Sequence, residues 1–208
     1  MATGDYWQNV YLTRLPDEVG WYEPDPVVSR RLVAEAIRDG AQSVIDVGGG
    51  ASSLVDHLLD LDIPRIAVLD VSEAGMDVSR RRLGSRASRV EWIAGDVTSV
   101  SDVGQFDIWH DRAVFHFLVE PEDRAAYVRL ANKTLGLGGT LFIATFAADG
   151  PERCSGLPVC RYDGDLLAQA LGPAFRLDAI ERYTHTTPGG VGQAFVYATF
   201  RRVDNVVD

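Results

Sequence analysis

Hydrophobic positions along the chain change spacing repeatedly, from short apolar runs typical of buried strands to the 3.6-residue spacing typical of helices. Apolar runs predict strands at residues 44–47, 66–70, 90–94, 106–110, 140–146, 175–183 and 193–201. Helical spacing, ended by glycines such as Gly40 and Gly84, predicts helices at residues 27–39, 52–61, 73–83, 121–135 and 164–171. Strands that alternate with helices predict a doubly wound, Rossmann-like α/β sheet with helices on both faces.

The pattern predicts a single domain over residues 30–208, preceded by an aromatic segment over residues 1–29. No internal repeat, low-complexity tract or linker interrupts it. A loop rich in glycine, proline and cysteine is expected at 147–159, and a second loop at 184–192 joins the last two strands. Four aromatic residues precede the first core helix and either fold over a ligand as a lid or pack as a cluster against the sheet: Trp7, Tyr11, Trp21 and Tyr22.

Glycines and acidic residues follow the first three predicted strands. Asp46 precedes the Gly48–Gly50 turn, Asp70 ends the second strand, and Asp96 follows the third. Glycine lets the backbone turn sharply and approach a ligand that a Cβ would block. A carboxylate at the position of Asp70 can accept both hydrogens of a ribose 2′,3′-diol, and Asp96 could accept from an adenine amino group. The pattern predicts a pocket for a nucleoside.

Dinucleotides and S-adenosylmethionine both contain such a nucleoside. The extra carboxylate of Asp46 matches a pyrophosphate poorly and suits a cationic ammonium. A chain of 208 residues also has little room for a dinucleotide half and a separate catalytic half. We therefore expect S-adenosylmethionine as the cofactor and S-adenosylhomocysteine as its product. The residues expected to contact it are Trp7, Tyr11, Trp21, Asp46, Gly48, Gly49, Gly50, Ser52, Asp70, Val71, Gly95, Asp96, Val97 and His110.

From about Arg30 to the C-terminus, the chain resembles class I methyltransferases, which have six parallel strands and an antiparallel last strand. The motifs that carry the resemblance are Asp46-Val47-Gly48-Gly49-Gly50, Asp70, Gly95-Asp96 and Phe106-Asp107-Ile108-Trp109. The resemblance implies that these positions bind the methionine moiety, the ribose and the adenine and lead to the substrate pocket. Ligands of open α/β sheets bind at the C-terminal ends of the strands, where all of these residues fall.

The loop after the fourth predicted strand begins with Asp111-Arg112 and continues into apolar residues. It is similar to the loop of thiopurine methyltransferase and its bacterial chalcogen-methylating relatives. Residues 6–11 and 21–22 also resemble the aromatic lid of these enzymes. A related pattern, an acidic residue followed by small residues, occurs in seven-stranded protein-lysine methyltransferases. The resemblance leaves the methyl acceptor open.

Three residues of this loop are candidates for the chemistry. His116 is the candidate general base, because imidazole titrates near neutral pH, with a structural role as the alternative. Asp111 and Arg112 either form an ion pair that shapes the loop or hold a polar group of the substrate. Methyl transfer is an in-line displacement, so positioning can supply about 7–11 kcal/mol of the barrier reduction. A thiolate acceptor needs little further help, whereas an alcohol or ammonium needs a base.

Five further residues are candidates for the substrate pocket. Cys154 and Cys160 do not have the spacing of zinc ligands, and no His/Cys cluster completes a metal site, so no metal is expected. The two thiols could capture a soft element such as selenium or could be ordinary loop residues. His185, expected after the sixth strand, either lies on the active-site rim or caps a turn. Tyr22 and Tyr162 complete the set.

Composition and charge argue against several classes of binding partner. The formal net charge is −10, which disfavours a nucleic-acid partner because phosphate recognition needs a basic face. Arginines at positions 80–82, 86 and 89 suit the C-terminal end of a helix. The N-terminus lacks a signal-peptide pattern, and no apolar run is long enough to span a membrane. We expect a cytoplasmic monomer or homodimer without membrane contact.

The sequence thus predicts an S-adenosylmethionine-dependent methyltransferase that acts on a small-molecule nucleophile, with a thiol or chalcogen compound preferred over oxygen or nitrogen. The acidic charge, the absence of a separate substrate domain, the thiopurine-type loop and the loop cysteines favour this function. One alternative is a protein-lysine methyltransferase, because an acidic surface could attract a basic target. The other is a protein that binds the cofactor without catalysis.

Overall fold

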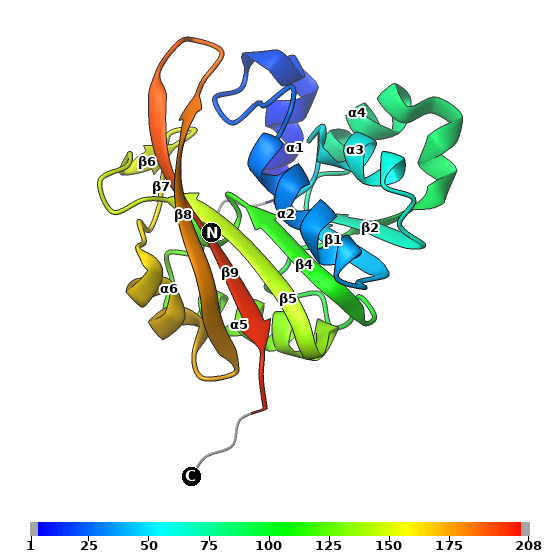
Figure 1. The fold of residues 1–208 in the computed structure, drawn as a ribbon. Helices are drawn as coiled ribbons and strands as arrows, with labels where there is room; N and C mark the ends of the chain where they lie inside the picture. Colours follow the sequence, from blue (N-terminus) through cyan, green and yellow to red (C-terminus); the bar gives the residue numbers. More distant parts are fainter. Residues whose placement is uncertain (1–3, 205–208) are drawn as a thin grey trace.

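The computed structural model describes residues 4–204, which form a seven-stranded sheet flanked by helices (Figure 1). The strands of this sheet are β1 (Ser43–Val47), β2 (Arg65–Asp70), β3 (Val90–Ala94), β4 (Phe106–Arg112), β5 (Leu135–Phe146), β8 (Phe175–Thr186) and β9 (Gly192–Arg202). The α-helices are α1 (Gly4–Thr13), α2 (Val27–Arg38), α3 (Leu54–Asp60), α4 (Glu73–Leu83), α5 (Pro121–Thr134) and α6 (Gly164–Leu171). The shorter elements are the 3₁₀ turns η1 (Pro16–Glu18), η2 (Gly84–Arg89) and η3 (Phe115–Phe117) and the hairpin strands β6 (Arg153–Cys154) and β7 (Leu157–Pro158).

The order of strands across the sheet is β3-β2-β1-β4-β5-β9-β8. Neighbouring strands run parallel except at β5–β9 and β8–β9, so that β9 runs against the other six strands of this seven-stranded sheet. The predicted doubly wound fold with an antiparallel last strand is confirmed. The chain builds outward from β1 to β3 and then returns to place β4 on the other side of β1. A ligand site is expected at this reversal, beyond the C-terminal ends of β1 and β4.

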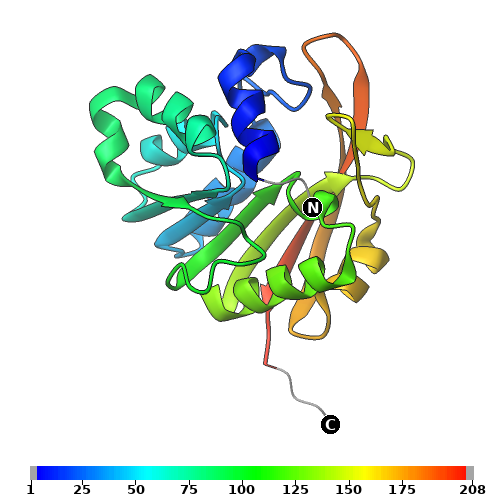
Figure 2. The same cartoon turned by 180° about the vertical axis from the view of Figure 1, so that it is seen from behind.

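Successive side chains of the central strands face opposite layers of the molecule. Val44 and Ile108 pack with residues of α2, α3 and α4, such as Leu58. Ile45 and Trp109, one residue further along, pack with residues of α5 and α6. Figures 1 and 2 show these two helical layers from opposite sides of the sheet. Burial on both faces explains why the strands appear in the sequence as continuous apolar runs.

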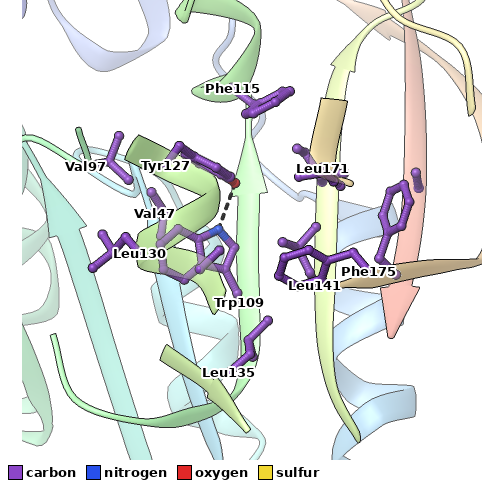
Figure 3. Packing of buried hydrophobic residues seen from close by; sticks show 14 of the residues in the cluster. Val47, Val97, Trp109, Phe115, Tyr127, Leu130, Leu135, Leu141, Leu171 and Phe175 are labelled. Atoms are coloured by element: carbon purple, nitrogen blue, oxygen red, sulfur yellow. Dashed lines mark hydrogen bonds between the residues drawn. The ribbon is translucent and has the colours of Figure 1, made fainter. Parts of the chain in front are cut away.

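The core beneath α5 leads directly to the C-terminal end of β4. Trp109 and Tyr127 are buried together with Phe115, and Trp109 Nε1 donates a hydrogen bond of 2.8 Å to the Tyr127 hydroxyl (Figure 3). That hydroxyl donates in turn to Asp111 Oδ2 at 2.8 Å. The core therefore fixes the Asp111 carboxylate and, with it, the start of the loop that follows β4.

Some segments differ from the prediction. The N-terminal aromatic segment contains the helix α1, and the predicted loop at 147–159 contains the β6–β7 hairpin. β5 begins at Leu135, directly after α5, and not near residue 140. Pairing of β8 with β9 continues to Thr186 and Gly192, which places His185 in a strand and not in a loop after it. Threonines at 184 and 186 favour extended backbone, which explains the longer ladder.

Within residues 4–204, no helix is long and apolar enough to cross a membrane.

Candidate active site

Two adjoining cavities lie at the C-terminal ends of the central strands, where the fold predicts a ligand. The first has a volume of about 110 Å³ and the second of about 50 Å³. Residues that line the first include Trp7, Tyr11, Trp21, Gly48, Asp70, Val71, Gly95, Asp96, Val97, Arg112, Val114, Phe117, Leu118 and Cys154. Residues that line the second include Tyr11, Trp21, Glu23, Ser29, Asp46, Gly48, Gly49, Ser52, His110 and Arg112. The shared residues show that the two cavities are neighbouring parts of one site.

The turn after β1 brings the backbone into close contact with its surroundings. Gly48 has a φ of 71°, and a Cβ at this position would lie 2.0 Å from Cγ2 of Val114. A Cβ on Gly49 would lie 2.6 Å from Asp46 Oδ2. Only glycine fits these two positions, which agrees with the reason given for glycine in the sequence motif.

Asp70 lies at the end of β2, buried at the wall of the first cavity. Its Oδ1 accepts a hydrogen bond of 2.7 Å from the backbone N–H of Ser72, whose hydroxyl oxygen accepts from Gly75 N at the start of α4. Burial raises the pKa of the Asp70 carboxyl to about 7. This carboxylate is therefore held in place by the cap of α4 and is stabilised further by any donor that the cavity receives.

Asp96 is placed by the turn that follows β3. Its Oδ1 accepts from the backbone N–H of Thr98 at 2.8 Å, while Gly95 N donates to the Asp70 carbonyl at 2.9 Å. Asp96 and Asp70 both line the first cavity, as the nucleoside motif predicts.

The N-terminal segment covers the first cavity. The side chain of Gln8 accepts from Ser72 Oγ and from Ala74 N at 3.1 and 3.0 Å, which fixes α1 on α4. Trp7 packs edge-to-face on both Trp21 and Phe117, with ring centroids 5.5 and 5.1 Å apart. The aromatic residues thus line the cavity and also pack on one another, which is compatible with both predicted alternatives.

Arg112 connects this N-terminal cover to the sheet. Its Nη1 donates to the Trp21 carbonyl at 2.9 Å, Nε donates to the Tyr197 hydroxyl at 3.1 Å, and Nη2 lies 3.2 Å from Glu23 Oε2. His185 Nε2 donates to the Gly20 carbonyl at 2.8 Å, and its Nδ1 lies 3.3 Å from Glu23. The arginine lines both cavities, whereas His185 is part of the supporting layer behind them.

Asp111 lies in the core and not in either cavity. It accepts hydrogen bonds from Val114 N, Phe115 N and Tyr127 Oη at 2.8, 3.1 and 2.8 Å. Burial raises the pKa of its carboxyl to about 6. Its observed contacts shape the loop after β4, and the predicted ion pair with Arg112 is replaced by the pair between Arg112 and Glu23.

His116 also lies outside the cavities that the described residues form. It is fully buried between Phe117 and Phe146, and the Phe146 N–H donates to its Nδ1 at 3.4 Å. Burial, together with the nearby Arg112, lowers the pKa of this imidazole to about 3. The 3₁₀ turn η3 directs the side chain inward, a direction that the sequence does not reveal. This position does not support His116 as a general base.

The remaining substrate-pocket candidates divide into two groups. Cys154 lines the first cavity, and burial raises the pKa of its thiol to about 11, so it is protonated at neutral pH. Tyr22, Cys160 and Tyr162 are not among the lining residues. Both cysteines are free. Within residues 4–204, no cluster of three or more His, Cys, Asp or Glu side chains could hold a metal ion.

Sequence reasoning missed several lining residues, and one of them had a visible signal. Ser29 lies one helical turn before Val33 on α2, so a hydroxyl occupies the apolar row of a core helix. The structure shows that this hydroxyl lies 2.9 Å from His110 Nε2, while His110 Nδ1 lies 2.7 Å from Asp46 Oδ1. For Glu23, Val114, Phe117 and Leu118, the spacing in the sequence gives no comparable indication.

The chemistry of these walls fits S-adenosylmethionine. The glycine turn admits a ligand beside the backbone, and the buried Asp70 and the half-buried Asp96 both line the cavity where a nucleoside is expected. Asp46 Oδ2 is buried without a hydrogen-bond partner among the described residues, so it can accept from a bound cation. Aromatic faces of Trp7 and Tyr11 suit a sulfonium.

Comparisons with known proteins agree with this fit. Residues 44–139 match a family model described as a methyltransferase domain. No curated protein sequence matches the chain. A structure reported for the conversion of a disulfide bond into a thioacetal group during echinomycin biosynthesis has a TM-score of 0.75 and 17% identity, over 98% of this chain and 93% of that one.

Two further similar structures contain S-adenosylhomocysteine. The N-methyltransferase NodS from Bradyrhizobium japonicum WM9 has a TM-score of 0.70 and 17% identity, over 95% of this chain and 98% of that one. The 1,6-didemethyltoxoflavin-N1-methyltransferase from Burkholderia thailandensis has a TM-score of 0.67 and 19% identity, over 95% and 83%. The family match over residues 44–139, the fold and the fitted walls together support a methyltransferase that uses S-adenosylmethionine as its cofactor.

Proposed function

We propose that this methyltransferase acts on a small-molecule nucleophile, with a thiol or another chalcogen compound as the preferred acceptor. The observation that carries the proposal is the contact between α1 and the β6–β7 hairpin, both of which contribute residues to the first cavity. The Tyr6 hydroxyl donates to the Ser155 carbonyl at 2.5 Å, so α1 and the β6–β7 hairpin meet over the cavity. A small acceptor fits beneath this cover, whereas a peptide substrate would need an open groove.

Within this proposal, the two cavities hold different parts of the cofactor. Asp70 accepts from the ribose hydroxyls, Asp96 from the adenine amino group, and Asp46 from the ammonium of the methionine moiety. The bound cofactor supplies a methyl group on a sulfonium, which is an activated leaving group. The protein has to align the nucleophile and exclude water, and the aromatic cover formed by Trp7 and Trp21 serves both purposes.

The acceptor wall, the side of the first cavity formed by Val114, Phe117, Leu118 and Cys154, favours a nucleophile that ionises easily. These residues make the wall largely apolar, and the candidate base His116 lies in the core, as does Asp111. An alcohol or a protonated amine would need a base at the wall. A thiol, with an ordinary pKa near 8.5, needs only modest stabilisation of its anion.

Arg112 can provide that stabilisation. Its guanidinium lowers the pKa of the Cys154 thiol, against the larger opposing effect of burial. An acceptor thiol bound beside Cys154 would experience the same positive charge. The proposed role of Arg112 is therefore to favour the acceptor thiolate while its hydrogen bonds hold the cover in place.

The similar structures differ in the chemistry reported for them, and one of them contains a bound small molecule, 1,6-didemethyltoxoflavin. One is reported with sulfur chemistry, the formation of a thioacetal, and two are N-methyltransferases. Sulfur is preferred here because of Arg112 and the apolar wall. Small amines are the alternative supported by the two N-methyltransferases.

The test is transfer of labelled methyl from S-adenosylmethionine into a cell lysate, separated afterwards into protein and small-molecule fractions. Label in small molecules that increases with added thiols or selenite supports the proposal. Label in amines points to the nitrogen alternative, and label in a discrete protein band contradicts a small acceptor. Cofactor binding without any transfer, when acceptors of all three classes are supplied, contradicts catalysis. Asp70→Ala provides the cofactor-site control.

A further inference from the structure

We propose that Ser29 and His110 are positioning residues that hold Asp46 with one carboxylate oxygen directed at the ammonium group of the cofactor. This inference rests on the proposed placement of the methionine moiety in the second cavity. It concerns a buried relay that spans α2, β4 and β1, all three members of which line that cavity.

The sheet and one helix bring the three side chains together. Asp46 and His110 are register partners on the neighbouring parallel strands β1 and β4. His110 Nδ1 lies 2.7 Å from Asp46 Oδ1, and its Nε2 lies 2.9 Å from Ser29 Oγ on α2. All three residues are at most 3% exposed. Hydrogen bonds in such a buried site are strong, and loss of one leaves a buried polar group unpaired at a large cost in free energy.

The partners assign the proton positions. A carboxylate can only accept, so Nδ1 of His110 carries the proton and donates to Asp46 Oδ1. Nε2 is then the acceptor, and the Ser29 hydroxyl donates to it. Both ring nitrogens then have a hydrogen-bond partner, and the carboxylate of Asp46 sets this tautomer. Oδ1 of Asp46 is engaged within the relay.

The second carboxylate oxygen of Asp46, Oδ2, takes no part in the hydrogen bonds of the relay. It is buried and has no hydrogen-bond partner among the described residues, and it lies against the Gly49 turn. A buried acceptor without a donor is unfavourable unless a ligand completes it. The ammonium is the group of S-adenosylmethionine that combines a positive charge with N–H donors, so it satisfies both requirements.

The test compares two ligands that share the adenosine part. S-adenosylhomocysteine carries the amino-acid end, and 5′-methylthioadenosine lacks it. We expect His110→Ala to weaken binding of the first by about ten- to hundredfold, the loss for one charge-assisted hydrogen bond, while binding of the second changes by less than about twofold. His110→Asn, which keeps a donor near the position of Nδ1, should recover part of the loss. Ser29→Ala should give a smaller loss with the same selectivity.

Calorimetric titration of the full-length chain measures these affinities, and thermal unfolding confirms that each variant is folded. Equal loss for both ligands would overturn the proposal, because the relay would then only support the fold. Unchanged binding of S-adenosylhomocysteine in folded His110→Ala would overturn it as well. Asp70→Ala is the matched control and should weaken both ligands. Failure of the unmodified protein to bind either ligand would instead refute the cofactor site itself.

Discussion

Asp70 has opposite effects on stability and on ligand binding. Burial favours the protonated carboxyl, whereas the proposed hydrogen bonds from the ribose need the ionised form. Its pKa rises from 3.8 to about 7 in the folded chain because burial disfavours the charged form. Between these two values the folded chain binds a proton more tightly than the unfolded chain does. The contribution of this carboxyl to the free energy of unfolding is therefore fully present below about pH 4 and is lost as the pH rises through about 7.

Asp70→Asn removes the ionisation and should change how stability depends on pH. We expect the difference in free energy of unfolding between the variant and the unmodified protein to shift in favour of the variant from about pH 5 to about pH 8. Urea unfolding at the two pH values, without cofactor, measures this difference. A difference that stays constant would contradict the raised pKa.

The same carboxyl should make cofactor binding depend on pH. Ribose hydroxyls donate to the ionised form, so affinity for S-adenosylhomocysteine should increase as the pH rises through about 7, the pKa of Asp70 in the free protein. Asp70→Ala should remove this dependence and weaken binding by about 1.5–3 kcal/mol, the value of a charge-assisted hydrogen bond. Calorimetry at several pH values checks both effects. A dependence on pH that persists in the variant would assign it to another group.

Residue types and their spacing were enough to predict that Asp70, Asp96 and Gly48 line one cavity, because they stand at strand ends whose direction follows from the fold. They were not enough for the chemistry of the loop after β4. Asp111 and His116 have the residue types of a catalytic pair, yet both side chains turn into the core. Their direction depends on η3 and on tertiary packing against Tyr127 and Phe146. The spacing of residues does not contain this information.

At the scale of elements, the alternation of strands and helices made the sheet predictable, but the site is completed by elements with weak local signals. Half of the ten residues of α1 are apolar or aromatic, but Val10 is the single buried one. Its position depends on Gln8 and Tyr11 binding to α4. The β6–β7 hairpin has two residues in each strand. Such elements are stabilised by tertiary contacts more than by their own propensity.

The contact between α1 and α4 can be tested at Gly75. A Cβ at this position would lie 3.0 Å from two atoms of the Tyr11 ring, which must move to accommodate it. Gly75 is buried in the first turn of α4, where the higher helix propensity of alanine, up to about 1 kcal/mol, offsets the strain at Tyr11. We therefore expect Gly75→Ala to weaken binding of S-adenosylhomocysteine without lowering Tm.

Gly136→Ala is the matched control, since a Cβ at Gly136 would meet no atom within 4 Å. It should leave cofactor affinity unchanged. Calorimetry and thermal unfolding of both variants provide the comparison. Equal affinities in the two variants would show that α1 does not have to remain in its observed position for the cofactor to bind.

At the scale of the whole molecule, several acidic side chains of the surface form ion pairs with arginines. Arg80, Arg82, Arg86 and Arg89 each lie within 4.0 Å of an acidic side chain of α3, α4 or the segment after α3. This agrees with the prediction of a charged helix end and leaves little free positive charge for a polyanion. Pairs of this exposed kind contribute little to stability.

Ligand binding should have a larger effect on stability than these pairs. The cofactor would bridge α1, the strand ends and the loop after β4, which separate on unfolding. At 100 times its Kd, a ligand raises the free energy of unfolding by about 2.7 kcal/mol, which corresponds to about 5–10 °C in Tm for a chain of this size. Thermal unfolding with S-adenosylhomocysteine measures the shift. Asp70→Ala at the same ligand concentration should shift less, and an equal shift would place the ligand elsewhere.

The hydrogen bond from Tyr6 to Ser155 couples the entry of the cofactor to the shape of the acceptor wall. Entry of the cofactor past α1 would break this hydrogen bond and free the hairpin that carries Cys154. The wall would then form again once α1 returns to its observed position over the bound cofactor. Turnover should follow a compulsory order, with the cofactor binding first and S-adenosylhomocysteine leaving last. Steady-state kinetics should show this product as a competitor of the cofactor and not of the acceptor.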